Sequence, residues 1–218
     1  MKKIYLFSTV LAMLSCTTET YDTGDGDLSY LRADLVMMHT ARAKAVDRLI
    51  TDDGQTLQLP QPVTVSWAER ADPLYRALAY YNDNKPAQRI EVKSIQPVYV
   101  LHPRLSEGTA GGAKADPVGI ESTWMSTGGL FINLALLLKS GQPDSDDARH
   151  VIGVVIDSET DDAITLTFDH DQGGVPPYYT SRLYASIPVS ETMKNKTVIL
   201  NVHTYDGLKT FTFPAPHT

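Results

Sequence analysis

The sequence has little cysteine, no long apolar run near its start and no cluster of basic residues. Its single cysteine, Cys16, excludes an internal disulfide and the thiolate cluster of a zinc site. The predominantly apolar run Ile4–Leu14 has 11 residues, whereas a membrane-spanning helix needs about 20. The formal net charge is −7. A negative chain without basic clusters argues against nucleic acid and anionic lipid headgroups as partners.

The residues before Cys16 have the layout of a bacterial lipoprotein signal. Two lysines, the short apolar run and a small residue, Ser15, lead into the cysteine. We predict that residues 1–15 are a signal peptide and that Cys16 carries lipid, such as palmitate, which anchors the chain to the outer membrane. Each buried CH₂ of such a lipid contributes about 0.8 kcal/mol. An ordinary secretory signal with a chance cysteine, or a buried N-terminal strand, is the alternative.

Residues 16–29 are polar, acidic and glycine-bearing, which predicts a flexible tether. An acidic stretch directly after a lipidated cysteine also resembles the surface-export signal of Bacteroidetes lipoproteins. A simple solvated linker has the same composition. Both a cell-surface and a periplasm-facing position therefore stay open at this point.

From Tyr30 onward the pattern predicts an all-β chain. Runs rich in Val, Ile, Thr, Tyr and Phe alternate with turn residues at close spacing. The clearest hairpin joins Val198–Val202 to Lys209–Phe213, with Asp206-Gly207 expected as a two-residue turn in which both residues have positive φ. Two further hairpins are expected, joining 45–50 to 56–59 and 150–157 to 164–168.

Two segments are ambiguous between helix and strand. Asp72-Pro73 resembles the start of a helix, but Tyr80 and Tyr81 end the run, so we predict a strand over Tyr75–Tyr81. Leu134–Leu138 is apolar on all sides. Its length and its β context predict a central strand buried on both faces.

A glycine- and alanine-rich stretch, residues 107–115, divides the chain. It contains no bulky apolar residue and predicts a linker. The expected units are residues 30–106 and 116–218, and both have the size of ordinary domains.

The second unit carries a recognisable series of short sequences. They are Asp116-Pro117-Val118, Trp124, Gly129–Leu134, His150, Leu166–Asp171, Tyr178-Tyr179-Thr180, Tyr184–Pro188 and Thr204–Thr210. Together with the lipoprotein start, the series resembles the NigD-like lipoproteins of Bacteroidetes. The resemblance implies an N-terminal OB-like barrel over residues 30–106 and a C-terminal antiparallel β-sandwich over 116–218. The family name derives from a gene linked to bacteriocin production, and the family supplies no catalytic residues to carry over.

No motif in the chain indicates a catalytic residue, a metal or a cofactor. Asp169–Gly174 has carboxylates before a glycine turn, but Gly173 and Thr180 occupy places where a calcium loop needs oxygen ligands and a glutamate. We expect the aspartates to cap backbone amides in a turn. The three histidines of the second unit have no spacing typical of zinc ligands; they are His150, His170 and His203.

Tyrosine is the abundant aromatic residue, with 11 copies against 5 Phe and 2 Trp. Tyr178 and Tyr179 follow two prolines on an expected exposed loop, and they are the candidate binding residues. Tyrosine suits sugar- and protein-binding surfaces because it joins a flat apolar ring to a hydroxyl. Covering the edge of the sandwich is the structural alternative for this pair.

These observations predict a non-enzymatic envelope lipoprotein that acts as a binding module for a glycan or a protein. One alternative is a hydrolase that uses paired carboxylates in a sandwich groove, for which Glu121, Asp157 and Asp171 are examples of suitable groups. The other alternative, which follows only from the resemblance, is a bacteriocin-associated accessory or immunity protein.

Overall fold

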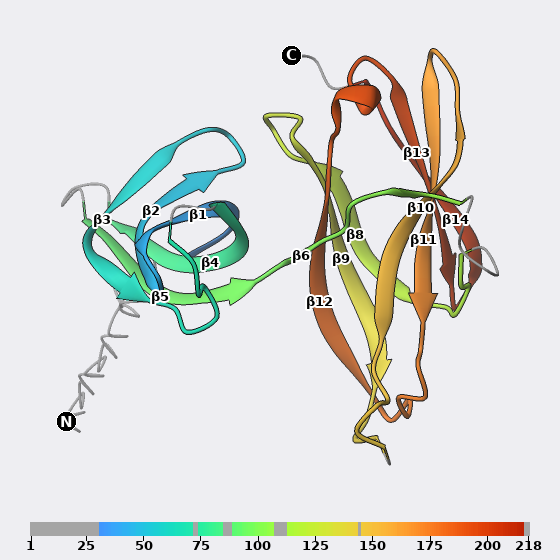
Figure 1. The fold of residues 1–218 in the computed structure, drawn as a ribbon, viewed down its shortest axis with the longest axis horizontal. Coiled ribbons are helices and arrows are strands. Elements are labelled where there is room, and N and C mark those ends of the chain that lie inside the picture. Colours follow the sequence, from blue (N-terminus) through green and yellow to red (C-terminus); the bar gives the residue numbers. More distant parts are fainter. Residues whose placement is uncertain (1–30, 72–73, 85–88, 107–112, 144, 216–218) are drawn as a thin grey trace, which may run out of the picture.

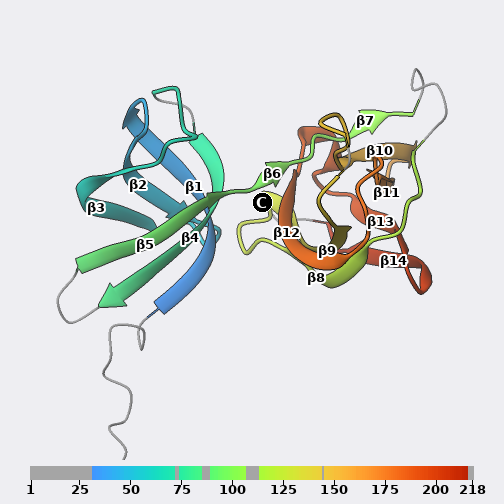
Figure 2. The same ribbon diagram turned by 90° about the horizontal axis from the view of Figure 1, so that it is seen from below.

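The chain is all-β in the computed structural model, which describes residues 31–71, 74–84, 89–106, 113–143 and 145–215. In these ranges the only helical element is the 3₁₀ turn η2 (Glu191–Met193). The strands form a barrel and a two-sheet sandwich, which are seen side by side in Figures 1 and 2. The predicted fold class, a barrel followed by a sandwich, is confirmed.

The barrel consists of the first five strands. They are β1 (Leu31–Arg42), β2 (Ala45–Thr51), β3 (Thr56–Thr64), β4 (Leu74–Asn84) and β5 (Arg89–Pro97). Their hydrogen-bonded order is β3-β2-β1-β4-β5, and the two outer strands, β3 and β5, contact each other. The resulting ring, β1-β2-β3-β5-β4, is the strand order of an OB-like barrel.

Irregular pairing explains why this sheet curls into a barrel. The register shifts within the β1–β2, β2–β3 and β4–β5 pairs. Such bulges add twist and bend the strands, which allows a five-stranded sheet to coil until its edges meet. Val36, Leu49 and Tyr81 are fully buried in the core that this coiling creates.

The sandwich is built from two sheets. The first has the order β14-β13-β11-β10-β7, and the second has the order β6-β12-β9-β8. The strands are β6 (Tyr99–Val100), β7 (Arg104–Leu105), β8 (Gly119–Met125), β9 (Phe131–Ser140), β10 (Val151–Glu159), β11 (Ala163–Asp171), β12 (Tyr179–Pro188), β13 (Thr197–Thr204) and β14 (Gly207–Phe213). Leu134, Leu166 and Phe168 are buried between the sheets.

The two ambiguous segments are strands. Tyr75–Tyr81 lies within β4, and Leu134–Leu138 lies within β9, which pairs with β8 on one side and β12 on the other. Ile132–Leu136 is buried without interruption. A central strand with side chains covered on both faces reads as a continuous apolar run, as the sequence indicates.

The three predicted hairpins form, with one correction at a turn. In the β13–β14 hairpin the loop is Tyr205-Asp206, and Thr204 pairs with Gly207. Only Gly207 has a positive φ, of 106°, so the expectation that Asp206 shares it is wrong. The positive φ therefore belongs to the first residue of β14, directly after the two-residue loop, and not to a residue of the loop itself.

The pairing of the sandwich begins before the predicted linker. β6 pairs with β12, and β7 pairs with β10, although both short strands precede residue 107. Further along the chain, the backbone N–H of Lys114 donates to Asp169, and Ala115 forms a β-bridge with His170. The N-terminal predictions, namely the signal peptide, the lipid on Cys16 and the tether, concern residues outside those that the structure describes, as do positions 107–112.

Candidate functional site

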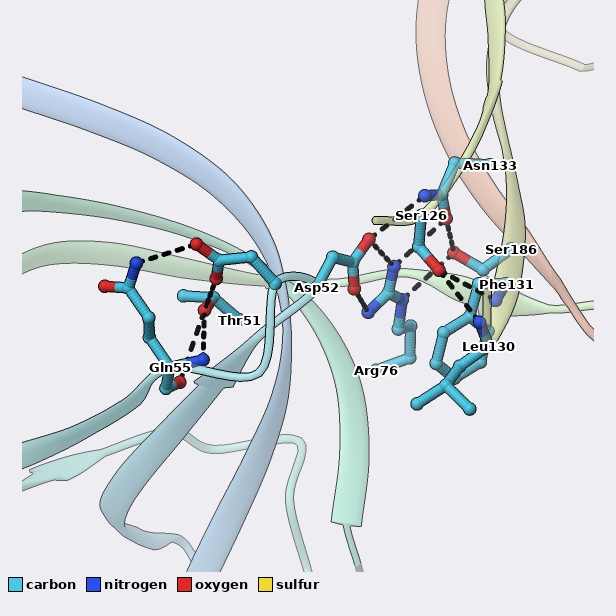
Figure 3. A network of polar contacts seen from close by, with 10 residues as sticks. Thr51, Asp52, Gln55, Arg76, Ser126, Leu130, Phe131, Asn133 and Ser186 are labelled. Carbon is cyan, nitrogen blue, oxygen red and sulfur yellow. Dashed lines mark hydrogen bonds and ion pairs between the residues drawn. The ribbon is translucent and has the colours of Figure 1, made fainter. Parts of the chain in front are cut away.

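A buried arginine joins the barrel to the sandwich. The side chain of Arg76, on β4, has no exposed surface, and it forms a bidentate ion pair with Asp52 at 2.6 and 2.8 Å. The same guanidinium donates to Oδ1 of Asn133 on β9 at 3.0 Å and to Oγ of Ser186 on β12 at 3.1 Å. It also lies 4.1 Å from the ring centroid of Phe131. Figure 3 shows these contacts reaching from one domain to the other.

Further hydrogen bonds complete the set. Asn133 donates to Oδ2 of Asp52 at 3.1 Å, and the Ser186 hydroxyl donates to Asn133 at 2.8 Å. We call Asp52, Arg76, Asn133 and Ser186 the interdomain network. A buried charge with this many directed partners costs little in the assembled protein and a great deal if one partner is removed. The network therefore fixes how the two domains sit together.

Two tight turns place Asp52 in the network. Asp52 lies in the β2–β3 turn, where Gly54 has a φ of 81° and its N–H donates to the Thr51 carbonyl. The β8–β9 turn of the sandwich meets it, since the N–H of Gly128 donates to the Asp52 carbonyl at 2.9 Å. A Cβ on Gly128 would lie 3.2 Å from that oxygen, so a glycine suits this approach.

Apolar contact supports the network. Leu35, Leu78 and Val98 form a small buried cluster, against which Tyr80 of the barrel and Tyr184 of the sandwich pack. This cluster lies on the outer face of the barrel, away from its own core, and so exists only because the sandwich covers it.

A groove of about 410 Å³ lies between the domains beside this contact. We call it the interdomain groove. Its walls are Arg32, Ala33, Asp34, Leu35, Thr51, Asp52, Asp53 and Leu78 from the barrel, with Glu121, Ser122, Trp124, Thr127, Ala135 and Tyr184 from the sandwich. The volume falls in the range of roughly 300–1,000 Å³ typical of small-molecule sites.

The sandwich wall of the groove is a regular array. Trp124, Asn133 and Ser186 stand opposite one another across β8, β9 and β12. Residues that are directly opposite in antiparallel strands share a face, so Trp124 lies on the same side as the network. The small Ser122 and Ala135 form the next row, which leaves open space beside the indole.

Each carboxylate of the groove has a fixed partner. Asp34 forms an ion pair with Arg32 at 3.0 Å, and Glu121 forms one with Arg182 at 2.5 Å. The Tyr81 hydroxyl also donates to Asp34, at 2.5 Å. Asp52 belongs to the interdomain network.

The fourth carboxylate, Asp53, has neutral partners. It accepts from the Thr51 hydroxyl and from Nε2 of Gln55, the latter at 2.7 Å. The hydrogen bond from Thr51 is the main cause that lowers the pKa of Asp53. A general acid needs the opposite, a carboxyl whose pKa is raised toward neutrality. Each of the four carboxylates of the groove therefore lies against a partner within the protein.

The predicted tyrosine pair lies elsewhere. Tyr178 and Tyr179 are 79 and 56% exposed. Tyr179 starts β12 opposite Ser140, five residues before the groove residue Tyr184 and so about 17 Å along the strand. The structure does not join the pair to the groove. Cys16, the predicted lipid site, lies outside the described residues.

The other sequence candidates have structural partners. Asp169 accepts from Arg104 and from the N–H of Lys114, both at 2.5 Å. The N–H of Gly173 donates to Asp171 at 2.8 Å, as expected of a capped turn. Asp157 accepts from the Thr167 hydroxyl at 2.5 Å. Within the described ranges, no three His, Cys, Asp or Glu side chains are placed to hold a metal ion.

Two of the three histidines do meet. Nδ1 of His150 lies 3.0 Å from Nε2 of His170, whose Nδ1 lies 3.0 Å from the carbonyl of Asp116. Burial, followed by the charge of His170, lowers the pKa of His150. The pair holds the start of the second predicted unit against β11. We assign it to structure rather than to chemistry.

The sequence itself identifies the family. Residues 102–215, more than half of the chain, match the model of the NigD-like C-terminal beta sandwich domain. The chain belongs to this family. The resemblance inferred from the short sequences of the second half is thus confirmed.

Solved structures extend the NigD-like likeness over both domains. A NigD-like immunity protein from Bacteroides caccae has a TM-score of 0.66 at 22% identity, covering 84% of this chain and 91% of its own. A candidate toxin-related protein from Parabacteroides distasonis has a TM-score of 0.63 at 19% identity, covering 84 and 92%. A lipoprotein candidate from Bacteroides fragilis has a TM-score of 0.61 at 13% identity, covering 86 and 98%. At these identities the likeness concerns the fold. Among curated proteins, no sequence matches this chain.

The interdomain network of this NigD-like chain was not predicted from the sequence. Arg76 is a single charge inside the run Leu74–Ala79, which is otherwise apolar apart from Tyr75. A charge in a buried strand requires a partner, and that requirement is the signal that would have found it. Trp124 was noted only as part of the family resemblance.

Proposed function

We propose that this protein is a lipid-anchored envelope lipoprotein that acts without catalysis, as a binding module whose ligand occupies the interdomain groove. One observation carries the proposal: the groove is lined by both domains, and the interdomain network holds those domains in one arrangement. Binding sites gain affinity when their groups are already in place, because less conformational entropy is lost on association. The ligand class is a glycan or a protein segment.

The state of the carboxylates favours binding over hydrolysis. A carboxylate-dependent hydrolase needs one protonated and one ionised group across its substrate. In the groove, Asp34, Asp52 and Glu121 are each paired with an arginine, and the pKa of Asp53 is lowered. The hydrolase alternative therefore has no support from this groove.

A groove-filling variant tests the proposal. Ser122, an exposed strand residue in the groove, is changed to tyrosine, and the exposed Ser158 on β10 is changed in the same way as a control. Binding to a panel of envelope and dietary glycans, and co-purification of partners from native cells, are then compared. We expect S122Y to lose binding and S158Y to retain it. Empty panels and empty co-purifications with the unmodified chain would refute a binding role.

A bacteriocin-associated immunity or accessory role is a second candidate. It is favoured by the fold shared with the NigD-like immunity protein of Bacteroides caccae. In this role the groove would receive a segment of a protein toxin. Deletion of the gene should then make the cells more sensitive to a bacteriocin produced in their own bacterial community. Unchanged sensitivity and unchanged production would remove this candidate.

Attachment to the outer membrane through Cys16 is part of the proposal. It is supported by the signal layout and by the fold shared with a lipoprotein candidate. In the part of the chain that the structure describes, there is no helix with the length and apolar character to cross a bilayer.

A further inference from the structure

We propose that the interdomain groove binds a neutral saccharide segment, with the indole of Trp124 as its stacking platform. This inference rests on the binding role proposed above and names the ligand class of the same groove. It is argued from the charge balance of the walls, from the position of the only tryptophan among the groove residues and from the carboxylates that line the groove.

The charge of the groove is nearly balanced. Arg32, Arg76 and Arg182 offset three of its four carboxylates, and all six groups are held in ion pairs. Only Asp53 lacks a cationic partner, and its contacts are a hydroxyl and an amide. A strongly charged ligand is attracted by a groove whose walls carry an excess of the opposite charge. The balance here favours an uncharged ligand.

The surface that remains is one flat ring and several polar groups. Trp124 is 36% exposed on the edge strand β8, and the small side chains of Ser122 and Ala135 leave room next to it. An indole offers a large apolar face with one polar edge. A sugar ring has a matching form, since its C–H groups cover one face and its hydroxyls surround the rim.

The hydroxyls of such a ligand would meet carboxylate acceptors that line the groove. Tyr81 and Arg32 contact the carboxylate of Asp34, and Arg182 contacts that of Glu121. Each ionised carboxylate has about four acceptor sites, so lone pairs remain beyond the contacts within the protein. Hydrogen bonds to charged groups are the stronger kind. An apolar ligand would leave these groups desolvated without compensation.

The first experiment uses the fluorescence of Trp124 itself. The chain has two tryptophans, and Trp67 packs in the barrel edge-on to Tyr75. In the mature Cys16→Ser chain, Trp67→Phe leaves Trp124 as the only tryptophan. It is titrated with neutral hexasaccharides of glucose, mannose, xylose and N-acetylglucosamine. Polygalacturonate and hexalysine serve as the charged probes. We expect a neutral saccharide to shift the emission, and no shift with any of them would overturn the inference.

Variants then locate the binding by calorimetry, with both tryptophans otherwise present. Trp124→Ala should weaken binding of the active saccharide about tenfold, which corresponds to roughly 1.4 kcal/mol. The double variant Tyr178→Ala/Tyr179→Ala removes exposed aromatics outside the groove and should bind normally. Circular dichroism checks that each variant is folded. Normal binding by Trp124→Ala, or binding of hexalysine alone, would overturn the saccharide assignment.

The two proposals fail in different ways. If no saccharide binds but a protein partner is lost specifically with S122Y, the saccharide inference falls and the binding role stands. If saccharide binding is lost only in the Tyr178/Tyr179 variant, a binding role stands at a different surface and the groove assignment falls. If neither saccharides nor partners bind, both proposals fall.

Discussion

At the scale of single residues, the fully buried guanidinium of Arg76 is the most consequential group in the molecule. Its charge has been removed from water, and the cost is offset only by Asp52, Asn133 and Ser186 acting together. Removing one partner from such a set leaves an uncompensated charge, whereas an exposed ion pair can be lost with little effect.

Asp52→Ala therefore should destabilise the protein by about 3–5 kcal/mol. Equilibrium unfolding in urea measures the change, and a lowered midpoint is expected. Asp53→Ala is the matched control, because Asp53 is the next residue in the same turn and makes no contact with Arg76 in the network. If Asp52→Ala lowered the free energy of unfolding no more than Asp53→Ala does, the result would contradict the importance of the network.

The pair formed by half-buried His150 and buried His170 gives a second residue-scale prediction. The pKa of His150 is lowered from 6.5 mainly by burial, so the unfolded chain binds its proton more readily than the folded one. The stability that depends on neutral His150 is then present above about pH 6.5 and is lost as the pH falls through the lower, folded pKa.

His150→Gln should flatten this dependence. Urea unfolding at pH 7.5 and at pH 5.5 gives the comparison, since carboxylate titration contributes little in that window. The unmodified protein should lose more unfolding free energy between the two values than the variant does. Equal losses would show that His150 does not titrate as its burial implies.

At the scale of strands and turns, local signals carried most of the prediction. The hairpins, the strand at β4 and the doubly buried β9 follow from patterns within about ten residues. The network does not, because Arg76 is 24 residues from Asp52 and 57 from Asn133 along the chain. The sandwich pairing of β6 and β7 was missed for the same reason. Two-residue strands carry no periodicity, and their partners β12 and β10 lie far along the sequence.

The β2–β3 turn links the element scale to the site. Gly54 has a φ of 81° and open space around the position of a Cβ, so a side chain there would meet backbone strain rather than a clash. Gly54→Ala should cost about 1–2 kcal/mol in unfolding free energy. Gly54→Asn should cost less, since asparagine tolerates this conformation better. Thermal unfolding of both variants checks the order, and the reverse order would contradict the turn geometry.

At the scale of the whole molecule, barrel and sandwich are joined by a polar network and by an apolar cluster that neither domain needs for its own core. Leu35 and Leu78 are buried with Val98 in this cluster, against which Tyr184 of the sandwich packs. The groove is therefore a property of the assembled pair. If the domains were separated, the barrel would expose the charge of Arg76, and each domain would keep only one wall of the groove.

The anchor determines what such a groove can reach, and it gives the last prediction. Cys16→Ser should remove lipidation and move the folded chain from the membrane fraction to the soluble fraction, because two or more acyl chains supply the anchoring energy. Fractionation after a salt wash, with circular dichroism of the released chain, measures this. A serine variant that stays membrane-bound would contradict the lipid anchor.

Protease treatment of intact cells carrying the unmodified protein then distinguishes a cell-surface position of the two domains from a periplasmic one. We expect digestion before lysis, since the acidic residues 16–29 resemble an export signal. Protection until lysis would place the groove in the periplasm and restrict its saccharides to those of the envelope.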